Sequence, residues 1–190
     1  MIAADTFDGA EGGLLTRTSP RPNDYVFVYE RGEYAIKKLN PTLPAAPIVF
    51  LRGEYKDTVI AVDVRIVGEA ASRYAFLVCR DSSASGQTRQ YRASIVPEGR
   101  RMILSVWGDG EQKVLAETRD NPAIQIANAI NRLELRCAGR KIEAIVNGKT
   151  VLSVEDSTLT SGEHGLGAGT FSGVEGVLEA RFDNLEVRQP

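Results

Sequence analysis

The stretch Ile142-Glu143-Ala144-Ile145-Val146-Asn147-Gly148-Lys149-Thr150-Val151-Leu152-Ser153-Val154 determines the fold class of this chain. Two short runs rich in Ile and Val, residues 142–146 and 150–154, flank the dipeptide Asn147-Gly148. An Asn-Gly pair suits the positive φ angles of a type I′ turn, which commonly joins two antiparallel strands. The stretch therefore predicts a β-hairpin with a two-residue turn.

The alternation of apolar and polar residues that marks a strand recurs over most of the chain. Between residues 58 and 66, Ile60, Val62, Val64 and Ile66 occupy every second position, typical of a strand with one buried face. Further strands are expected over residues 25–29, 34–38, 48–51, 74–80, 90–96, 102–107, 132–138, 141–146, 150–154 and 180–187. Many short strands without alternating helices predict an all-β sandwich or barrel, with strand over more than about 40% of the chain.

Two segments depart from this pattern. Asn121-Pro122 precedes a short apolar run and resembles the capped start of a helix, so we expect a connecting turn or loop with at most about two helical turns. Residues 162–167, Gly-Glu-His-Gly-Leu-Gly, are expected to form a glycine-rich turn. His164, the only histidine, would then be exposed.

Composition narrows the class of protein. The chain has 190 residues, of which 43% are hydrophobic and 25% charged, which fits one globular domain over residues 1–190 and excludes global disorder. Its 23 basic and 25 acidic residues give a net charge of −2, which argues against a nucleic-acid partner. No apolar run reaches about 18 residues, so no membrane insertion is expected. The first residues do not resemble a signal peptide, so the chain is either cytoplasmic or a module of a longer exported protein.

Cys79 and Cys137 each follow the apolar alternation of their strands, so both are expected to point into the core. Two cysteines are too few for a disulfide scaffold, and their spacing fits no zinc motif. Two interpretations stay open from the residues alone, namely two inert buried thiols or one disulfide that joins two strands.

The order of several short motifs resembles the concanavalin A-like lectin/glucanase superfamily. Within it, the chain is most similar to laminin G-like and 3-keto-disaccharide hydrolase-like jelly rolls of bacterial envelope proteins. The motifs are Asp5-Thr6-Phe7, the runs at 29–36, 76–80, 91–95, 133–139, 145–148 and 162–167, and Arg181-Phe182-Asp183-Asn184-Leu185-Glu186-Val187. The resemblance implies a jelly-roll sandwich of two antiparallel sheets, with both termini close together on neighbouring strands.

The resemblance also bears on the cysteines and on metals. A Cys-Arg pair and a Cys-x-Gly motif recur together in such envelope proteins, which favours the disulfide between Cys79 and Cys137. Several members of the superfamily bind calcium where the termini meet, so Asp5, Asp8 and Asp183 are candidate calcium ligands. The alternative is that these carboxylates cap turns. No other cofactor is expected.

No catalytic residue is predicted. Related glucanases carry a Glu-x-Asp-x-x-Glu array, which this sequence lacks, and its nearest acids, Asp63, Glu134 and Glu143, stand singly on strands. A Ser-His-Asp hydrolase would have to use His164, and no Gly-x-Ser-x-Gly motif accompanies it. The sequence thus favours a binding module over an enzyme.

The candidate ligand-binding residues are Trp107, Arg80, Arg92, Asp63 and Arg65, which all lie opposite the expected core faces of their strands. A tryptophan ring can stack on a sugar, and arginine can bind its oxygens, a carboxylate above all. The alternative is that these charges pair across strands without any ligand. The remaining aromatic candidates, Phe7, Phe50, Phe171 and Phe182, are expected in the core.

We therefore expect a non-catalytic, extracytoplasmic module of a larger protein that binds a saccharide or a cell-envelope component. The first alternative is an enzyme, a glycoside hydrolase of the 3-keto-disaccharide hydrolase type. The second is a structural spacer or oligomerisation domain. An enzyme requires converging carboxylates in a deep pocket, a lectin requires a groove with an exposed aromatic ring, and a spacer requires neither.

Overall fold

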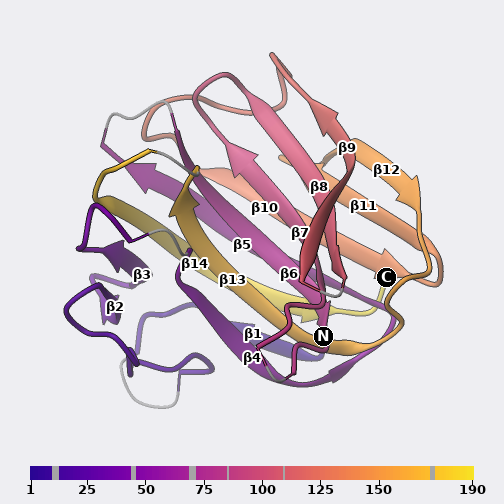
Figure 1. The fold of residues 1–190 in the computed structure, drawn as a ribbon, viewed down its shortest axis with the longest axis horizontal. Coiled ribbons are helices and arrows are strands. Elements are labelled where there is room, and N and C mark those ends of the chain that lie inside the picture. The colour runs from indigo at the N-terminus through magenta and orange to yellow at the C-terminus, as the bar shows by residue number, and fades with distance from the viewer. Residues whose placement is uncertain (10–12, 44–45, 69–71, 85, 109, 172–173) are drawn as a thin grey trace.

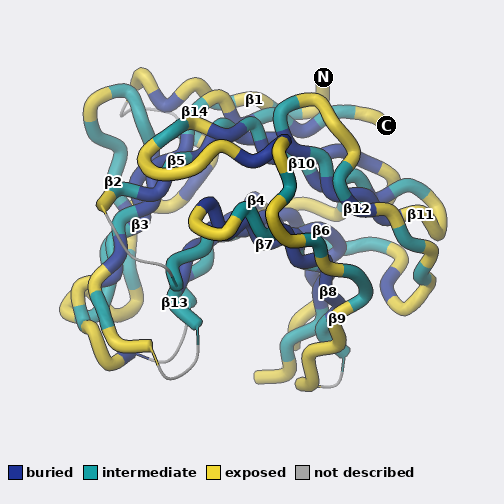
Figure 2. The backbone as a smooth tube through the Cα atoms, turned by 90° about the horizontal axis from the view of Figure 1, so that it is seen from above, coloured by how far each residue is buried: buried dark blue, intermediate teal, exposed yellow. Residues whose placement is uncertain are grey.

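The computed structural model describes all residues except 10–12, 44–45, 69–71, 85, 109 and 172–173. In the described residues the chain forms fourteen β-strands and no helix, and the strands build two antiparallel sheets that pack face to face (Figures 1 and 2). Strand makes up 61% of the described residues, which confirms the all-β prediction and its lower bound of about 40%.

The larger sheet has eight strands. Its order is β12 (Lys149–Glu155), β11 (Lys141–Val146), β10 (Asn131–Ala138), β5 (Thr58–Val67), β14 (Leu178–Arg188), β3 (Glu33–Lys38) and β2 (Tyr25–Glu30), and β1 (Ala3–Asp5) pairs with the end of β14. Because Ala3 lies opposite Val187, the two termini are neighbours, as predicted (Figure 2).

The smaller sheet has six strands and forms the lower layer in Figure 2. Its order is β4 (Ile48–Tyr55), β13 (Gly162–Thr170), β6 (Arg73–Asp81), β7 (Gln90–Val96), β8 (Arg101–Gly108) and β9 (Glu111–Thr118). All strands expected from the sequence are present, and β1, β9 and β13 are additional. The described residues contain no helix long and apolar enough to cross a membrane.

The predicted hairpin joins β11 and β12. Asn147 and Gly148 have φ angles of 50° and 76°, as a type I′ turn requires. The Asn147 side chain also holds the turn to its surroundings, because its oxygen accepts from the backbone N–H of Arg132 at 2.8 Å. Its amide nitrogen donates to the carbonyl of Ala123 at 2.8 Å and to Asn131 Oδ1 at 3.0 Å.

The segment after Asn121 forms turns and no helix. The Asn121 side chain accepts from the backbone N–H of Ala123 at 3.0 Å, and the Asn121 carbonyl accepts from that of Ile124 at 3.1 Å. Ile124 is buried in the core cluster. The Asn-Pro signal therefore marks a tight turn that packs an isoleucine onto the core.

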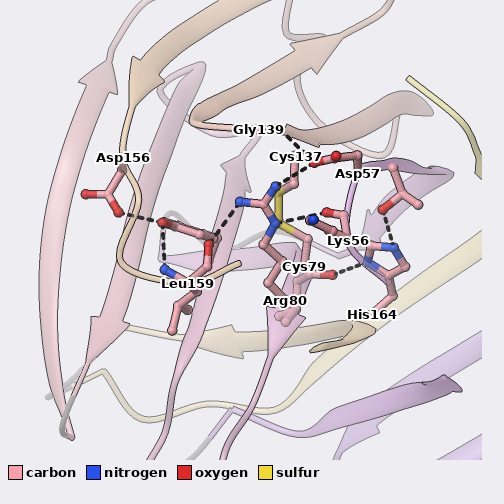
Figure 3. Close-up of a disulfide and its surroundings, with 12 residues drawn as sticks. Lys56, Asp57, Cys79, Arg80, Cys137, Gly139, Asp156, Leu159 and His164 are labelled. Carbon is pink, nitrogen blue, oxygen red and sulfur yellow. Dashed lines mark hydrogen bonds and ion pairs between the residues drawn. A yellow bond between two sulfur atoms is a disulfide. The ribbon is translucent and has the colours of Figure 1, made fainter. Parts of the chain in front are cut away.

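The core lies between the two sheets, where every second residue of a strand is buried. β10 shows this most clearly, because Leu133, Leu135 and Cys137 are fully buried while the residues between them are partly exposed. Cys137 of β10 and Cys79 of β6 form a disulfide with a Cα–Cα distance of 6.8 Å (Figure 3). The two sheets are thus covalently joined through the middle of the core.

The prediction of a glycine-rich turn with an exposed His164 is wrong. Residues 162–170 form β13, an interior strand of the six-stranded sheet, and His164 is fully buried. The reason is that Gly165, Gly167 and Gly169 occupy the outward positions of this strand, so the apolar alternation is seen only in part. Rings from the neighbouring strands fill the space that the missing side chains leave.

Candidate functional site

The outer face of the six-stranded sheet, turned away from the other sheet, carries a pocket of about 440 Å³ that we call the Trp107 pocket. Strands β6 to β9 supply most of its wall. The described residues that line it are Ala46, Tyr74, Thr88, Arg92, Ser94, Ile103, Trp107, Gln112, Thr170 and Phe171. Its lining is mixed, with aromatic rings, one cation and several hydroxyls, and such a mixture is typical of ligand sites.

The floor of the pocket depends on the glycines of β13. A Cβ atom at Gly167 would lie 2.3 Å from Cζ of Phe76, and one at Gly169 would lie 2.9 Å from the hydroxyl of Tyr74. The rings of Phe76 and Tyr74 therefore lie directly against the backbone of β13. Tyr74 also contacts Phe171, with ring centroids 5.0 Å apart, so an aromatic wall continues along this side of the pocket.

Arg92 lies between two of these aromatic rings. Its guanidinium carbon is 4.0 Å from the ring centroid of Phe76 and 5.5 Å from that of Trp107, within the range of cation–π attraction. In the amide orientation that satisfies both neighbours, Gln90 accepts from Arg92 Nη2 at 2.5 Å and donates to Asp81 Oδ2 at 3.0 Å. Among the described residues, Arg92 thus reaches a carboxylate only through the Gln90 amide.

Two side-chain donors at the site lack a partner in the described part of the chain. Nε of Arg92 and Nε1 of Trp107 are buried and have no hydrogen-bond partner among the residues that the structure describes. Burial lowers the pKa of Arg92, and it raises the pKa of the Asp81 carboxyl behind Gln90. Among the lining residues that the structure describes, none is an aspartate or glutamate.

Of the five candidate ligand-binding residues, the structure brings Trp107 and Arg92 together. Arg80 lies elsewhere, at the edge of the core beside the disulfide, and its side chain is 1% exposed (Figure 3). It donates to the carbonyls of Lys56 and Leu159 at 3.0 and 2.9 Å and to Asp57 at 3.1 Å. These bonds tie two loops to the core and leave Arg80 outside the Trp107 pocket.

Asp63 and Arg65 lie on the other sheet, on its outer face. Arg65 forms a two-pronged ion pair with Glu33, with distances of 2.9 and 2.7 Å. Asp63 accepts from Arg132 at 3.4 Å and from the Asn184 amide at 2.9 Å. Both residues therefore fit the alternative expectation, in which the charges pair across strands without a ligand.

The pocket also contains residues that the sequence pattern assigns to the core or does not mark as candidates. Phe171, expected in the core, is partly exposed and lines the pocket, and Phe50 is partly exposed on the same sheet, whereas Phe7 and Phe182 are buried as expected. Tyr74 could have been found, because it lies opposite the buried residues of its own strand. Phe171 could not have been found in this way, because it directly follows β13, and the glycines of β13 mask the alternation that would reveal a strand.

The candidate calcium ligands do not form an evident site. Asp5 caps a turn, since its carboxylate accepts from the backbone N–H groups of Phe7 and Leu14, both at 2.8 Å. Burial, together with the charges of Asp63 and Asp8, raises the pKa of Asp183. Over the described part of the chain, no three His, Cys, Asp or Glu side chains are placed to hold a metal ion.

The two packed antiparallel sheets define the fold as a jelly-roll sandwich. Its solved relatives include the carbohydrate-binding module CBM66 from Bacillus subtilis, with a TM-score of 0.64 and 15% identity over 81% of this chain and 86% of that chain. They also include a Bacillus licheniformis β-glucanase, with a TM-score of 0.71 and 12% identity over 99% and 98% of the two chains.

A third similar structure is a Bacillus subtilis protein of unknown function with a galectin-like fold, with a TM-score of 0.69 and 12% identity over 99% of this chain and 95% of that chain. No family model and no curated protein sequence matches this chain. At these identities the comparisons establish the fold. The neighbours include both carbohydrate-binding modules and glycoside hydrolases.

Proposed function

We propose that this chain is a non-catalytic saccharide-binding module whose ligand occupies the Trp107 pocket. The observation that carries the proposal is the arrangement of Trp107 and Arg92 in one pocket with an aromatic wall and several hydroxyl groups. The C–H faces of a sugar ring pack on aromatic rings, while its hydroxyls require donors and acceptors around them. The side chains of Thr88, Thr170 and Gln112 can supply these donors and acceptors.

The absence of carboxylates from the described lining favours binding over hydrolysis. Retaining hydrolysis needs two carboxyl groups about 5 Å apart, and inverting hydrolysis needs two about 6.5–9.5 Å apart. Asp81 is a single carboxyl group, it is buried, and Gln90 separates it from Arg92. If the protein nevertheless released sugar from oligosaccharides, and an Asp81→Asn variant did not, the enzymatic alternative would replace this proposal.

The disulfide supports a place outside the cytoplasm, because such bonds persist in oxidising compartments. We therefore assign the module to an extracytoplasmic or cell-surface protein of which it forms one part, with a saccharide or another cell-envelope component as ligand. A spacer or oligomerisation domain would need no pocket with an unpaired cation, so it fits the observations less well.

The test uses Trp107, the only tryptophan of the chain, as both probe and target. Binding on a glycan array should identify ligands, and these should change the tryptophan fluorescence of the intact protein. Trp107→Ala should lower the affinity at least tenfold while it lowers the melting temperature by less than about 5 °C, because the side chain is partly exposed at a strand end. Val114→Ala, an exposed position on the neighbouring strand, is the control.

Two outcomes would contradict the proposal. If Trp107→Ala lost stability and binding to the same degree, Trp107 would be a packing residue. If ligands bound equally well to the variant, their site would lie elsewhere on the molecule.

A further inference from the structure

Two cations at the Trp107 pocket, the partly buried Arg92 in its lining and the buried Lys38 behind it, differ from the arginines of the eight-stranded sheet. On the outer face of the eight-stranded sheet, arginines such as Arg65 and Arg181 pair directly with carboxylates. Arg92 forms no ion pair with any described residue, and the same is true of Lys38. Lys38 is 1% exposed, and its ammonium group donates to the carbonyl of Pro41 at 3.2 Å and to the Thr170 hydroxyl at 3.0 Å.

Thr170 is also a lining residue, so Lys38 lies directly behind the wall of the pocket. Neither of the two acids that act on these cations forms a direct ion pair with them. Asp81 meets Arg92 only through the Gln90 amide, and the charge of Glu175 acts on Lys38 from beyond ion-pair distance. Burial of a cation without a counter-ion costs free energy, and an anion bound beside it offsets that cost.

We propose that the saccharide recognised in the Trp107 pocket is acidic, and that Arg92 binds its carboxylate. This inference rests on the proposed function and specifies its ligand class as a uronic acid. A guanidinium presents its N–H donors in a planar fork that matches a carboxylate, while the aromatic wall of Tyr74, Phe171 and Trp107 accommodates the sugar ring. The ammonium group of Lys38, which lies behind Thr170, adds to the electrostatic attraction for the carboxylate.

The experiment compares matched pairs of sugars that differ in charge. Methyl β-D-glucuronoside is set against methyl β-D-glucoside, and methyl α-D-galacturonoside against methyl α-D-galactoside. Titrations follow Trp107 fluorescence and the heat of binding. In at least one pair the acid should bind at least tenfold more tightly than the neutral sugar, and the difference should shrink as the salt concentration rises.

Three variants identify the residue responsible. Arg92→Gln should bring the affinity for the acid down to that for the neutral partner, and Arg92→Lys should retain part of the preference because it keeps the charge without the fork. Arg140→Gln makes the same change of charge at an exposed position in the turn between β10 and β11, so it should leave both affinities unchanged. Melting temperatures establish that each variant is folded.

The outcomes separate this inference from the function on which it rests. If neutral sugars bind in a Trp107-dependent manner and no acid binds better, the acidic ligand is excluded and the saccharide module stands. If neither the array nor the paired sugars produce Trp107-dependent binding, both proposals fail. If Arg140→Gln lowers the preference as much as Arg92→Gln, net charge explains the result and the assignment to Arg92 is overturned.

Discussion

At the scale of single residues, His164 is a titratable group buried in the protein interior. Its Nδ1 lies 3.2 Å from the carbonyl of Val78 and its Nε2 lies 2.8 Å from the Thr58 hydroxyl. Since a carbonyl only accepts, Nδ1 carries the proton and Nε2 accepts from Thr58. The Tyr55 ring stacks on the imidazole at a centroid distance of 4.3 Å. The site therefore fits a neutral imidazole.

This arrangement predicts a loss of stability in mild acid. Burial, helped by the charge of Arg80, lowers the pKa of His164 from 6.5 to about 4. Between these values the unfolded chain binds the proton more tightly, so the free energy of unfolding should fall as the pH drops, by about 2–3 kcal/mol between pH 7 and 4.5. Urea titrations at several pH values measure it. His164→Gln should remove this slope, and equal slopes for the two proteins would contradict the explanation.

At the scale of elements, β13 is the strand that shapes the pocket, because its glycines let the neighbouring rings lie flat. Gly167→Ala would place a methyl group 2.3 Å from the Phe76 ring and 2.6 Å from the carbonyl of Pro47. Overpacking of this kind costs about 1–3 kcal/mol, and displacement of Phe76 should also disturb Arg92 and weaken binding. Gly108→Ala is the control, since the nearest atom lies 3.9 Å away. A Gly167→Ala protein with unchanged stability and binding would refute this account.

β13 also shows why part of the fold and of the site escaped prediction. Alternation is visible in β5 and β10, where Ile, Val and Leu occupy the inward positions, but in β13 glycines separate the inward residues and imitate a turn. Alternation does identify the outward positions of Trp107 and Arg92. It cannot assign a strand to a sheet, so it groups Asp63 and Arg65, which lie on the outer face of the other sheet, with Trp107 and Arg92. Arg80 has a φ of 54°, which no alternation predicts and which takes it out of the strand geometry.

At the scale of the whole molecule, the disulfide joins the sheets between residues 58 positions apart in the sequence. Closing a loop of this length should stabilise the fold by about 4 kcal/mol through the entropy of the unfolded chain. Urea unfolding with and without reductant measures this contribution. A Cys79→Ala, Cys137→Ala double variant should be insensitive to reductant. The expectation fails if reductant leaves the wild-type midpoint unchanged or if the denatured, unreduced protein yields two free thiols.

The Asn147 turn has a consequence for the chemical durability of the molecule. In a flexible chain, the nitrogen of a glycine attacks the preceding asparagine side chain and releases ammonia, so Asn-Gly is a weak point of ageing proteins. Here the Asn147 amide is fixed through both its oxygen and its nitrogen, by bonds to Arg132, Ala123 and Asn131, and it is kept from the geometry of attack. We therefore expect Asn147 to lose its amide group more slowly in the folded protein than in the unfolded chain.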